Sequence, residues 1–185
     1  MACRTTPAKS ISENISPETQ AIIERVTGTR YVDPKDLPSA LILRGCKDLV
    51  DVSSLGGVKY LDLEGCTGVV DVSPLGGGGV KHLDLEGCTG VVDVSALGTC
   101  TTLQHLNLTW CTGVVDVSAL GGVKYLDLWG CTGVVDVSAL GACRYLDLEG
   151  CTGVVDVSAL GACRYLNLRG CTGVVDVSAV PQAYH

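Results

Sequence analysis

Leucines separated by a single residue recur in pairs along most of the chain. Side chains two positions apart lie on the same face of an extended strand, so each pair predicts a short strand with one buried face. An apolar residue precedes most pairs by three positions, and a cysteine follows every pair by three positions. The pairs are Leu41 and Leu43, Leu61 and Leu63, Leu83 and Leu85, Leu106 and Leu108, Leu126 and Leu128, Leu146 and Leu148, and Leu166 and Leu168.

A second recurring segment, Val-Asp-Val-Ser, follows each cysteine and ends two residues later in leucine or, in the last copy, valine. It is too short for an α-helix but suits a 3₁₀ turn, and an aspartate just before such a turn can cap its free N–H groups. The aspartates are Asp51, Asp71, Asp93, Asp116, Asp136, Asp156 and Asp176. The pattern therefore alternates predicted strands with predicted 3₁₀ turns.

The cysteines of successive copies are 20, 22, 23, 20, 20 and 20 residues apart. With the spacing apolar-x-x-Leu-x-Leu-x-x-Cys, residues 38 to 180 resemble the leucine-rich repeat family, whose motif recurs every 20 to 29 residues. The Val-Asp-Val-Ser-x-Leu segment is similar to internalin-like repeats, and the cysteine is similar to that of the cysteine-containing subtype. The resemblance implies an α/β-type solenoid that is mostly β: a right-handed superhelix with a parallel sheet on one face and 3₁₀ turns on the other.

The chain divides into three expected parts: an N-terminal segment over 1–37, seven repeats over 38–180 and a tail over 181–185. Ser16 followed by Pro17 predicts a helix start, and Gly28 predicts its end. Ile22, Ile23 and Val26 would form an apolar face, so we expect this helix to cap the first repeat. The tail shows no recognisable cap, which predicts an exposed last repeat and a possible route to self-association.

Composition narrows the expected partners and location. Asp and Glu number 20 against 13 Lys and Arg, so net charge gives no support to a nucleic-acid or anionic-membrane partner. No run of 18 apolar residues occurs, and the first residues lack the apolar block of a signal peptide. The odd count of 11 cysteines does not suggest a disulfide framework. We therefore expect an intracellular, cytoplasmic protein with free thiols.

The column of repeat cysteines is the first candidate for chemistry. Neighbouring strands about 4.8 Å apart would place the sulfurs within reach of disulfide bonds. Metal sites, however, favour closely spaced pairs such as C-x-x-C, which are absent. The family resemblance implies a buried structural role with bonds to loop carbonyls, and Cys3 is then the expected reactive thiol. The structural cysteines are Cys46, Cys66, Cys88, Cys111, Cys131, Cys151 and Cys171.

Other chemistry finds less support. Stacked aspartates could bind calcium, but each repeat offers one carboxylate per column, so capping and pairing with Lys or Arg explain them better. A single row of threonines resembles ice-binding arrays without their double row. No nucleophile is paired with a histidine base, and no phosphate loop occurs. We expect no enzyme activity, no metal and no cofactor.

Function is then expected on the strand residues turned away from the core. These form a basic, an aromatic, an acidic and a variable column, and the departures cluster where Trp110 replaces a recurring glycine and Trp129 follows on the next strand. Trp110 could instead cover Gly130 to fill a gap. Exposed Trp with adjacent Tyr is nevertheless typical of a binding hot spot. The predicted partner-binding residues are Tyr60, His82, His105, Asn107, Thr109, Trp110, Tyr125, Asp127, Trp129 and Tyr145.

Two functions follow as hypotheses. The first, which the family resemblance favours, is a non-catalytic module that presents its strand face to a protein or peptide. The second is a structural protein whose copies associate through the solenoid ends or within a larger particle.

Overall fold

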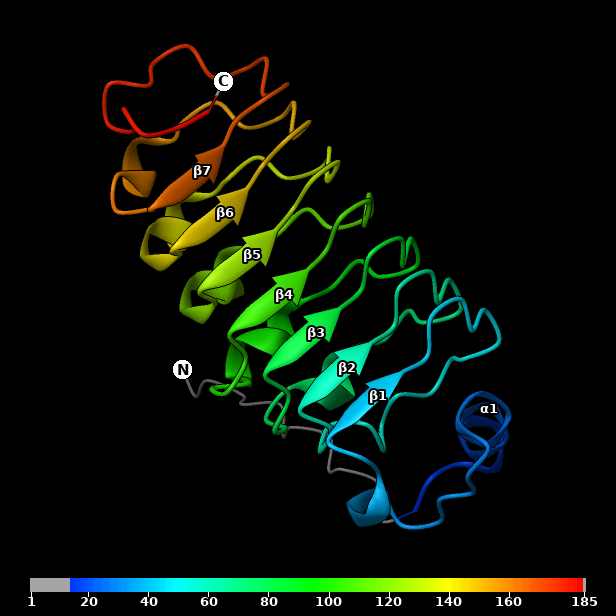
Figure 1. Cartoon of the computed structure of the whole chain (residues 1–185). Helices are drawn as coiled ribbons and strands as arrows, with labels where there is room; N and C mark the ends of the chain where they lie inside the picture. Colours follow the sequence, from blue (N-terminus) through cyan, green and yellow to red (C-terminus); the bar gives the residue numbers. More distant parts are fainter. Residues whose placement is uncertain (1–13, 185) are drawn as a thin grey trace, which may run out of the picture.

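A computed structural model describes residues 14–184 of the chain. Seven short strands lie side by side in one sheet, each parallel to the next and in chain order (Figure 1). The strands are β1 (Ala40–Ile42), β2 (Tyr60–Asp62), β3 (His82–Asp84), β4 (His105–Asn107), β5 (Tyr125–Asp127), β6 (Tyr145–Asp147) and β7 (Tyr165–Asn167). The expectation of a mostly β solenoid with a parallel sheet is confirmed.

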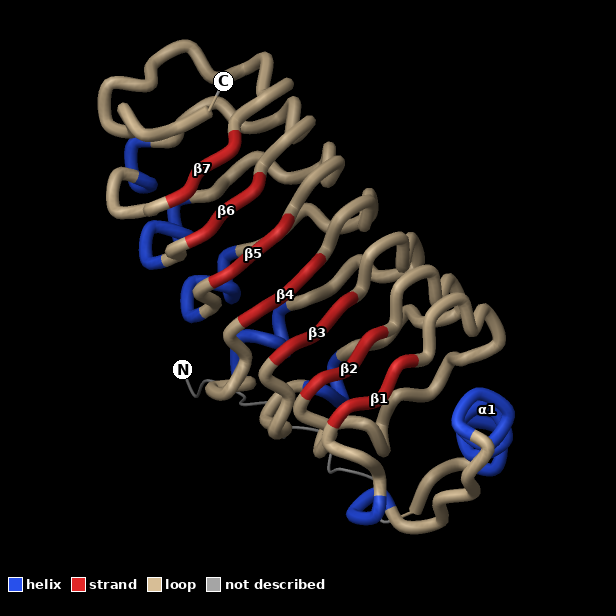
Figure 2. The backbone as a smooth tube through the Cα atoms, in the orientation of Figure 1, coloured by secondary structure: helices blue, strands red, loops and turns tan. Residues whose placement is uncertain are grey.

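Short 3₁₀ helices line the side opposite the strands (Figure 2). They are η2 (Ser73–Leu75), η3 (Ser95–Thr99), η4 (Ser118–Gly122), η5 (Ser138–Ala142) and η6 (Ser158–Leu160), and a further one, η1 (Pro34–Asp36), precedes β1. In all seven repeats the predicted aspartate accepts a hydrogen bond from the backbone N–H of the serine two residues later, at 2.8–2.9 Å. The carboxylate thus fixes the start of each turn.

The core runs between the sheet and these turns as one continuous cluster. Both leucines of every pair are buried, as are the valine after the aspartate and the leucine that ends the segment in most repeats. The first of the two adjacent valines, which is Leu49 in the first repeat, is buried in every repeat except the last, where Val174 is partly buried. The second valine is exposed, from 56% for Val115 to 64% for Val50 and 90% for Val175. This exposed valine column was not predicted from the sequence.

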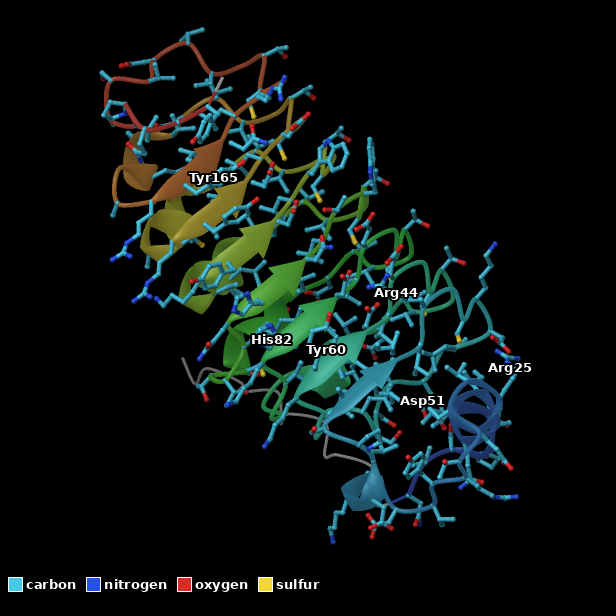
Figure 3. All side chains as sticks on the ribbon, in the orientation of Figure 1. Arg25, Arg44, Asp51, Tyr60, His82 and Tyr165 are labelled. Carbon is cyan, nitrogen blue, oxygen red and sulfur yellow. The ribbon has the colours of Figure 1, made fainter. Side chains whose placement is uncertain are left out.

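Helix α1 (Pro17–Thr27) packs on the first repeat, as predicted. Ser16 accepts a hydrogen bond from Thr19 N–H, and Gly28 ends the helix in the left-handed conformation. Thr19 donates to the Asp51 carbonyl at 2.8 Å, and Arg25, which lies at the β1 end of the molecule in Figure 3, forms a two-pronged ion pair with Asp48. The prediction for Val26 was wrong, because its side chain is 45% exposed, and Ile22 and Ile23 are the buried apolar residues of the helix.

The tail lies against the last strand. Tyr184 N–H donates to the Leu166 carbonyl, and Leu168 N–H donates to the Tyr184 carbonyl at 2.7 Å, so the tail adds a single bridge beside β7. The Gln182 amide donates to the Cys163 carbonyl. The prediction that this end has no cap was wrong for the edge of β7, which the tail covers. The tail pairs with β7 through backbone groups, so its sequence does not need the leucine pattern of a repeat.

Candidate functional site

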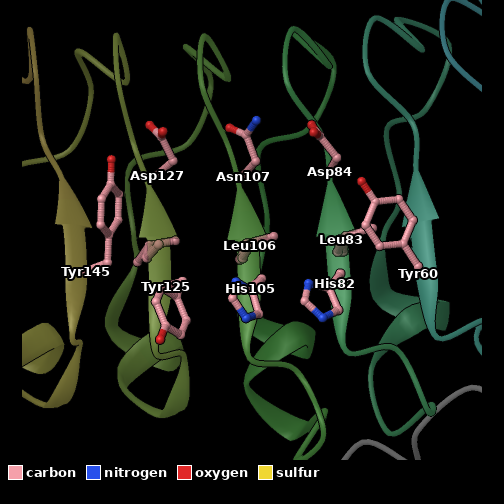
Figure 4. Close-up of a pocket in the computed structure, with 11 residues that line it drawn as sticks. Tyr60, His82, Leu83, Asp84, His105, Leu106, Asn107, Tyr125, Asp127 and Tyr145 are labelled. Carbon is pink, nitrogen blue, oxygen red and sulfur yellow. The ribbon is translucent and has the colours of Figure 1, made fainter.

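A row of aromatic rings crosses the outer face of the sheet. Since the strands pair in register, the first residues of β2 to β7 stack beside one another. His82 and His105 lie 4.1 Å apart between ring centroids, and His105 and Tyr125 also 4.1 Å, all nearly parallel. Tyr145 and Tyr165 form a second stack at 4.3 Å. Figure 4 shows that the Tyr125 and Tyr145 rings turn in opposite directions, so the row divides between them.

This division bounds an open groove of about 220 Å³ above β3, β4 and β5. Tyr60 and Tyr145 stand at its two ends, the rings of His82, His105 and Tyr125 form one edge, and the opposite edge is polar (Figure 4). The strand positions between the two edges are Leu83, Leu106 and Leu126, whose side chains are buried. The groove is therefore aromatic on three sides and polar on the fourth.

The polar edge consists of Asp84, Asn107 and Asp127. Asp127 accepts hydrogen bonds on one oxygen from Trp129 N–H at 2.9 Å and from the Thr109 hydroxyl at 3.0 Å. Burial raises the pKa of the Asp127 carboxyl, although both hydrogen bonds act in the opposite direction. Thr109 itself is only 3% exposed, so the prediction of Thr109 as an outward contact residue was wrong. Its hydroxyl instead orients Asp127 from below.

The acidic column is less exposed at its N-terminal end than expected. Asp62 is fully buried and pairs with Arg44, whose guanidinium lies 2.7 Å from the carboxylate and also contacts Glu64 at 3.0 Å. Asn167, at the other end of the column, is also buried, and its amide donates to both carboxylate oxygens of Asp147. The column of like charges is thus interrupted by an arginine at one end and an amide at the other.

The two tryptophans adjoin the polar edge of the groove. Their ring centroids lie 5.4 Å apart, and Trp110 is 47% and Trp129 42% exposed. Trp110 is the sole non-glycine residue of the described chain with a positive φ, 59°, where the other repeats have glycine at 68–74°. Its ring lies over Gly130, so close that a Cβ there would meet it at 2.6 Å. Trp110 therefore does cover Gly130, but leaves about half of its surface open.

His105 occupies the centre of the stacked rings. Burial and the neighbouring His82 both lower the pKa of His105, because a charged imidazolium would lose water and face a second imidazole at 4.1 Å. The ring is accordingly neutral at neutral pH.

Comparisons with known proteins agree with the fold described above. Residues 99–119 match the profile of a family described as Leucine Rich repeat. The structure of an internalin C2 (inlC2) of Listeria monocytogenes superposes on this chain with a TM-score of 0.60 at 20% sequence identity. The superposition covers 96% of this chain and 98% of the internalin chain. The chain therefore has the fold of a leucine-rich repeat solenoid. An internalin (inlF) of the same organism gives a TM-score of 0.58 at 22% identity and covers 82% of this chain, which spans about half (49%) of that protein. No curated protein sequence matches this chain.

The repeat cysteines lie inside the leucine-rich repeat solenoid, where most of their thiols donate to the carbonyl of the leucine that directly follows the strand of the preceding repeat. Cys66 donates to the Leu43 carbonyl at 2.9 Å and Cys131 to that of Leu108 at 3.0 Å, and four others repeat the contact. All ten cysteines of residues 14–184 are free and buried. Burial raises the pKa of Cys88 to about 12, which keeps the thiol protonated. Cys3 lies outside the described residues.

Seven of the ten predicted contact residues line the groove: Tyr60, His82, His105, Asn107, Tyr125, Asp127 and Tyr145. Trp110 and Trp129 form a second patch beside Asp127, and Thr109 is buried. The sequence-based set omitted Asp84, which completes the polar edge, although its place in the acidic column of the leucine-rich repeats was a usable signal.

Within residues 14–184 of the solenoid, no three His, Cys, Asp or Glu side chains are grouped so that they could hold a metal ion. The described helices are all too short or too polar to cross a membrane.

Proposed function

We propose that this solenoid is a non-catalytic interaction module whose strand face binds a protein or peptide. The contact surface comprises the groove and the tryptophan pair, Trp110 with Trp129. The fold supports the general statement that such repeats mediate protein interactions. The partner surface rests on the residues of this chain.

The strained backbone of Trp110 carries the proposal. A non-glycine residue in the left-handed region costs on the order of 1–2 kcal/mol, and the equivalent glycines of the other repeats avoid that cost. The strain places a large apolar ring half in solvent, beside a second half-exposed tryptophan. Local strain that yields an exposed aromatic pair indicates binding rather than folding.

Covering Gly130 is the competing explanation for Trp110. Gly65, Gly87 and Gly170 occupy equivalent positions without such a cover, because a Cβ at each would meet only backbone atoms of the preceding glycine within 4 Å. The fold therefore tolerates an uncovered glycine at this site.

The substitution Trp110→Gly separates these explanations, because it restores the residue that the other repeats use. Relief of strain and loss of ring contacts oppose each other, so we expect the free energy of unfolding to change by less than about 1 kcal/mol. Peptides selected against the wild-type strand face from a random display library should bind Trp110→Gly at least about tenfold more weakly, since hot-spot tryptophans contribute about 2 kcal/mol or more.

A matched control is Tyr184→Ala, which removes an aromatic ring at the far end of the same sheet. This variant should leave the affinity for the peptides unchanged. Equal peptide binding by wild type and Trp110→Gly would reject the proposed surface. A large loss of stability in Trp110→Gly would show that the ring serves folding.

Association through the solenoid end is the second candidate function. Val175, in the last repeat, is 90% exposed, compared with 56–64% for the equivalent valines of the other repeats. The side of this repeat away from the strands is thus open to a further molecule, whereas the tail covers the strand side.

A further inference from the structure

We propose that the groove receives a basic side chain, an arginine or lysine of the bound peptide. This inference rests on the proposed peptide-binding function and adds the chemistry of the residue that occupies the groove. Its observations concern Asp84, Asp127 and the surrounding rings rather than the tryptophan pair.

The size of the groove suits one side chain. Its volume of about 220 Å³ lies below the roughly 300–1,000 Å³ typical of pockets that hold a whole small molecule. Tyr60 and Tyr145 limit its length at opposite ends, as Figure 4 shows. A long, flexible side chain attached to a peptide lying across the sheet fits this space better than a free ligand does.

Among the described residues, no cation is directly paired with the carboxylates of the groove, and Arg44, which pairs with Asp62 and Glu64, attracts Asp84 only at longer range. Within residues 14–184, neither Asp84 nor Asp127 forms an ion pair, while the outer members of the same column are matched: Asp62 by Arg44, and Asp147 by the amide of Asn167. Asp84 uses one oxygen for Glu86 N–H, as Asp127 does for Trp129 N–H, and the second oxygen of each has no partner among the described residues. The unmatched carboxylates are those that line the groove.

The spacing of these carboxylates favours a shared cation. Asp84 and Asp127 are on strands β3 and β5, with Asn107 on β4 between them. Since adjacent strands are about 4.8 Å apart, a cation above Asn107 would lie roughly 5 Å from both carboxylates. Glu86, which accepts a hydrogen bond from Asn107 at 3.2 Å, adds a third negative charge nearby.

The rings around the groove also favour a cation. Arginine and lysine are attracted to the faces of tyrosine rings, and two tyrosines stand at the ends of the groove. The central imidazole of His105 is neutral at neutral pH, so it does not oppose the incoming charge. An acidic side chain would instead face Asp84 and Asp127, and the groove lining contains no lysine or arginine to offset the repulsion.

The direct test titrates the full chain with Nα-acetylarginine methylamide and follows backbone amide signals by NMR. The control probe is Nα-acetylcitrulline methylamide, which has the same shape but no charge. We expect saturable shifts at residues 82–84, 105–107 and 125–127 with the arginine probe. The citrulline probe should bind at least about fivefold more weakly, because its neutral urea group forms weaker hydrogen bonds to carboxylates than a charged guanidinium does.

The matched variants are Asp84→Asn combined with Asp127→Asn, and Asp147→Asn alone. Asparagine keeps the oxygen that accepts the backbone N–H, so the turns should remain folded. The double variant should lose most of the preference for arginine over citrulline. Asp147→Asn should retain it, because Asn167 already occupies that carboxylate.

Equal binding of the two probes, no saturable shift, or shifts at another surface would overturn the cationic occupant. Selected peptides that bind through Trp110 but contain no required basic residue, or a required acidic one, would also overturn it while leaving the proposed interaction function intact. Conversely, an arginine preference that survives in Trp110→Gly supports the groove even if the tryptophan surface fails its own test.

Discussion

Thr109 and Trp110 are adjacent in the chain, yet one is buried and the other half exposed. Thr109 directs its hydroxyl to Asp127, whereas Trp110 turns outward through a positive φ of 59°. A glycine at position 110 would give the same chain path without a side chain. At the residue scale, the two departures from the repeat therefore have different effects. The buried Thr109 orients the carboxylate of Asp127, and Trp110 adds exposed apolar surface.

The stacked imidazole of His105 makes a prediction about pH. Its pKa is lowered by burial and by His82, so the unfolded chain binds more protons than the folded one once the pH falls below about 6.5, the ordinary histidine value. Its contribution to folding is therefore complete above that pH and is lost as the pH falls through the folded pKa. Denaturant unfolding from pH 8 to pH 5 should show this decline.

The variant His105→Tyr provides the control for that measurement. Tyrosine occupies the same position in β2, β5, β6 and β7, and it does not titrate in this range. The decline in stability should be shallower in His105→Tyr. An identical slope in both proteins would show that the carboxylates or His82 cause the acid loss instead.

At the element scale, the sequence predicts regular strands and turns because each copy repeats the same burial requirement. Two leucines per strand and the valine and leucine of the turn can be buried only by neighbouring repeats, so the period alone determines the sheet. The carboxylate caps could be predicted because each aspartate stands just before a turn whose first N–H groups need an acceptor. The pairing of Tyr184 with β7 escaped prediction because it uses backbone groups, which Pro181-Gln-Ala-Tyr does not reveal.

The groove escaped prediction for another reason. The aromatic and acidic columns are visible in the sequence, but the opposite turn of the Tyr125 and Tyr145 rings is a rotamer choice that the letters do not encode. The exposed valine column was missed because both adjacent valines are apolar, and one of them must face outward in each repeat.

The stacking of turns predicts an asymmetry between two glycines. A Cβ at Gly68 would collide with the Lys47 carbonyl oxygen of the preceding repeat and lie 2.7 Å from that of Leu49, whereas a Cβ at Gly57 would meet nothing within 4 Å. Gly68→Ala must push two repeats apart and should lower the free energy of unfolding by about 1–3 kcal/mol. Gly57→Ala should be neutral or stabilise by up to about 1 kcal/mol, since alanine restricts the unfolded chain.

Thermal or urea unfolding of the two alanine variants checks this prediction. Equal stabilities would mean that neighbouring turns are not packed as closely as the structure shows.

At the scale of the whole molecule, the ends of the solenoid differ. Helix α1 covers the first repeat through Ile22, Ile23 and the Arg25 ion pair with Asp48. The tail covers the strand side of the last repeat, whereas Val174 and Val177 are less buried than their equivalents in the other repeats. End-to-end association would bury this surface, while a net charge of −7 opposes the approach of two copies.

Sedimentation velocity over a hundredfold range of concentration decides between the two candidate functions. We expect a monomer throughout at physiological salt, because one open valine row gives little area to offset the repulsion between acidic copies. Association that grows with concentration and disappears in Val175→Lys would favour the assembly function, since the substitution places a charge on the open end. Val155→Lys is the matched control, because it changes the same column within the solenoid, where the next repeat already covers the end surface. A monomer that still binds selected peptides through Trp110 would leave the strand face as the working surface of the molecule.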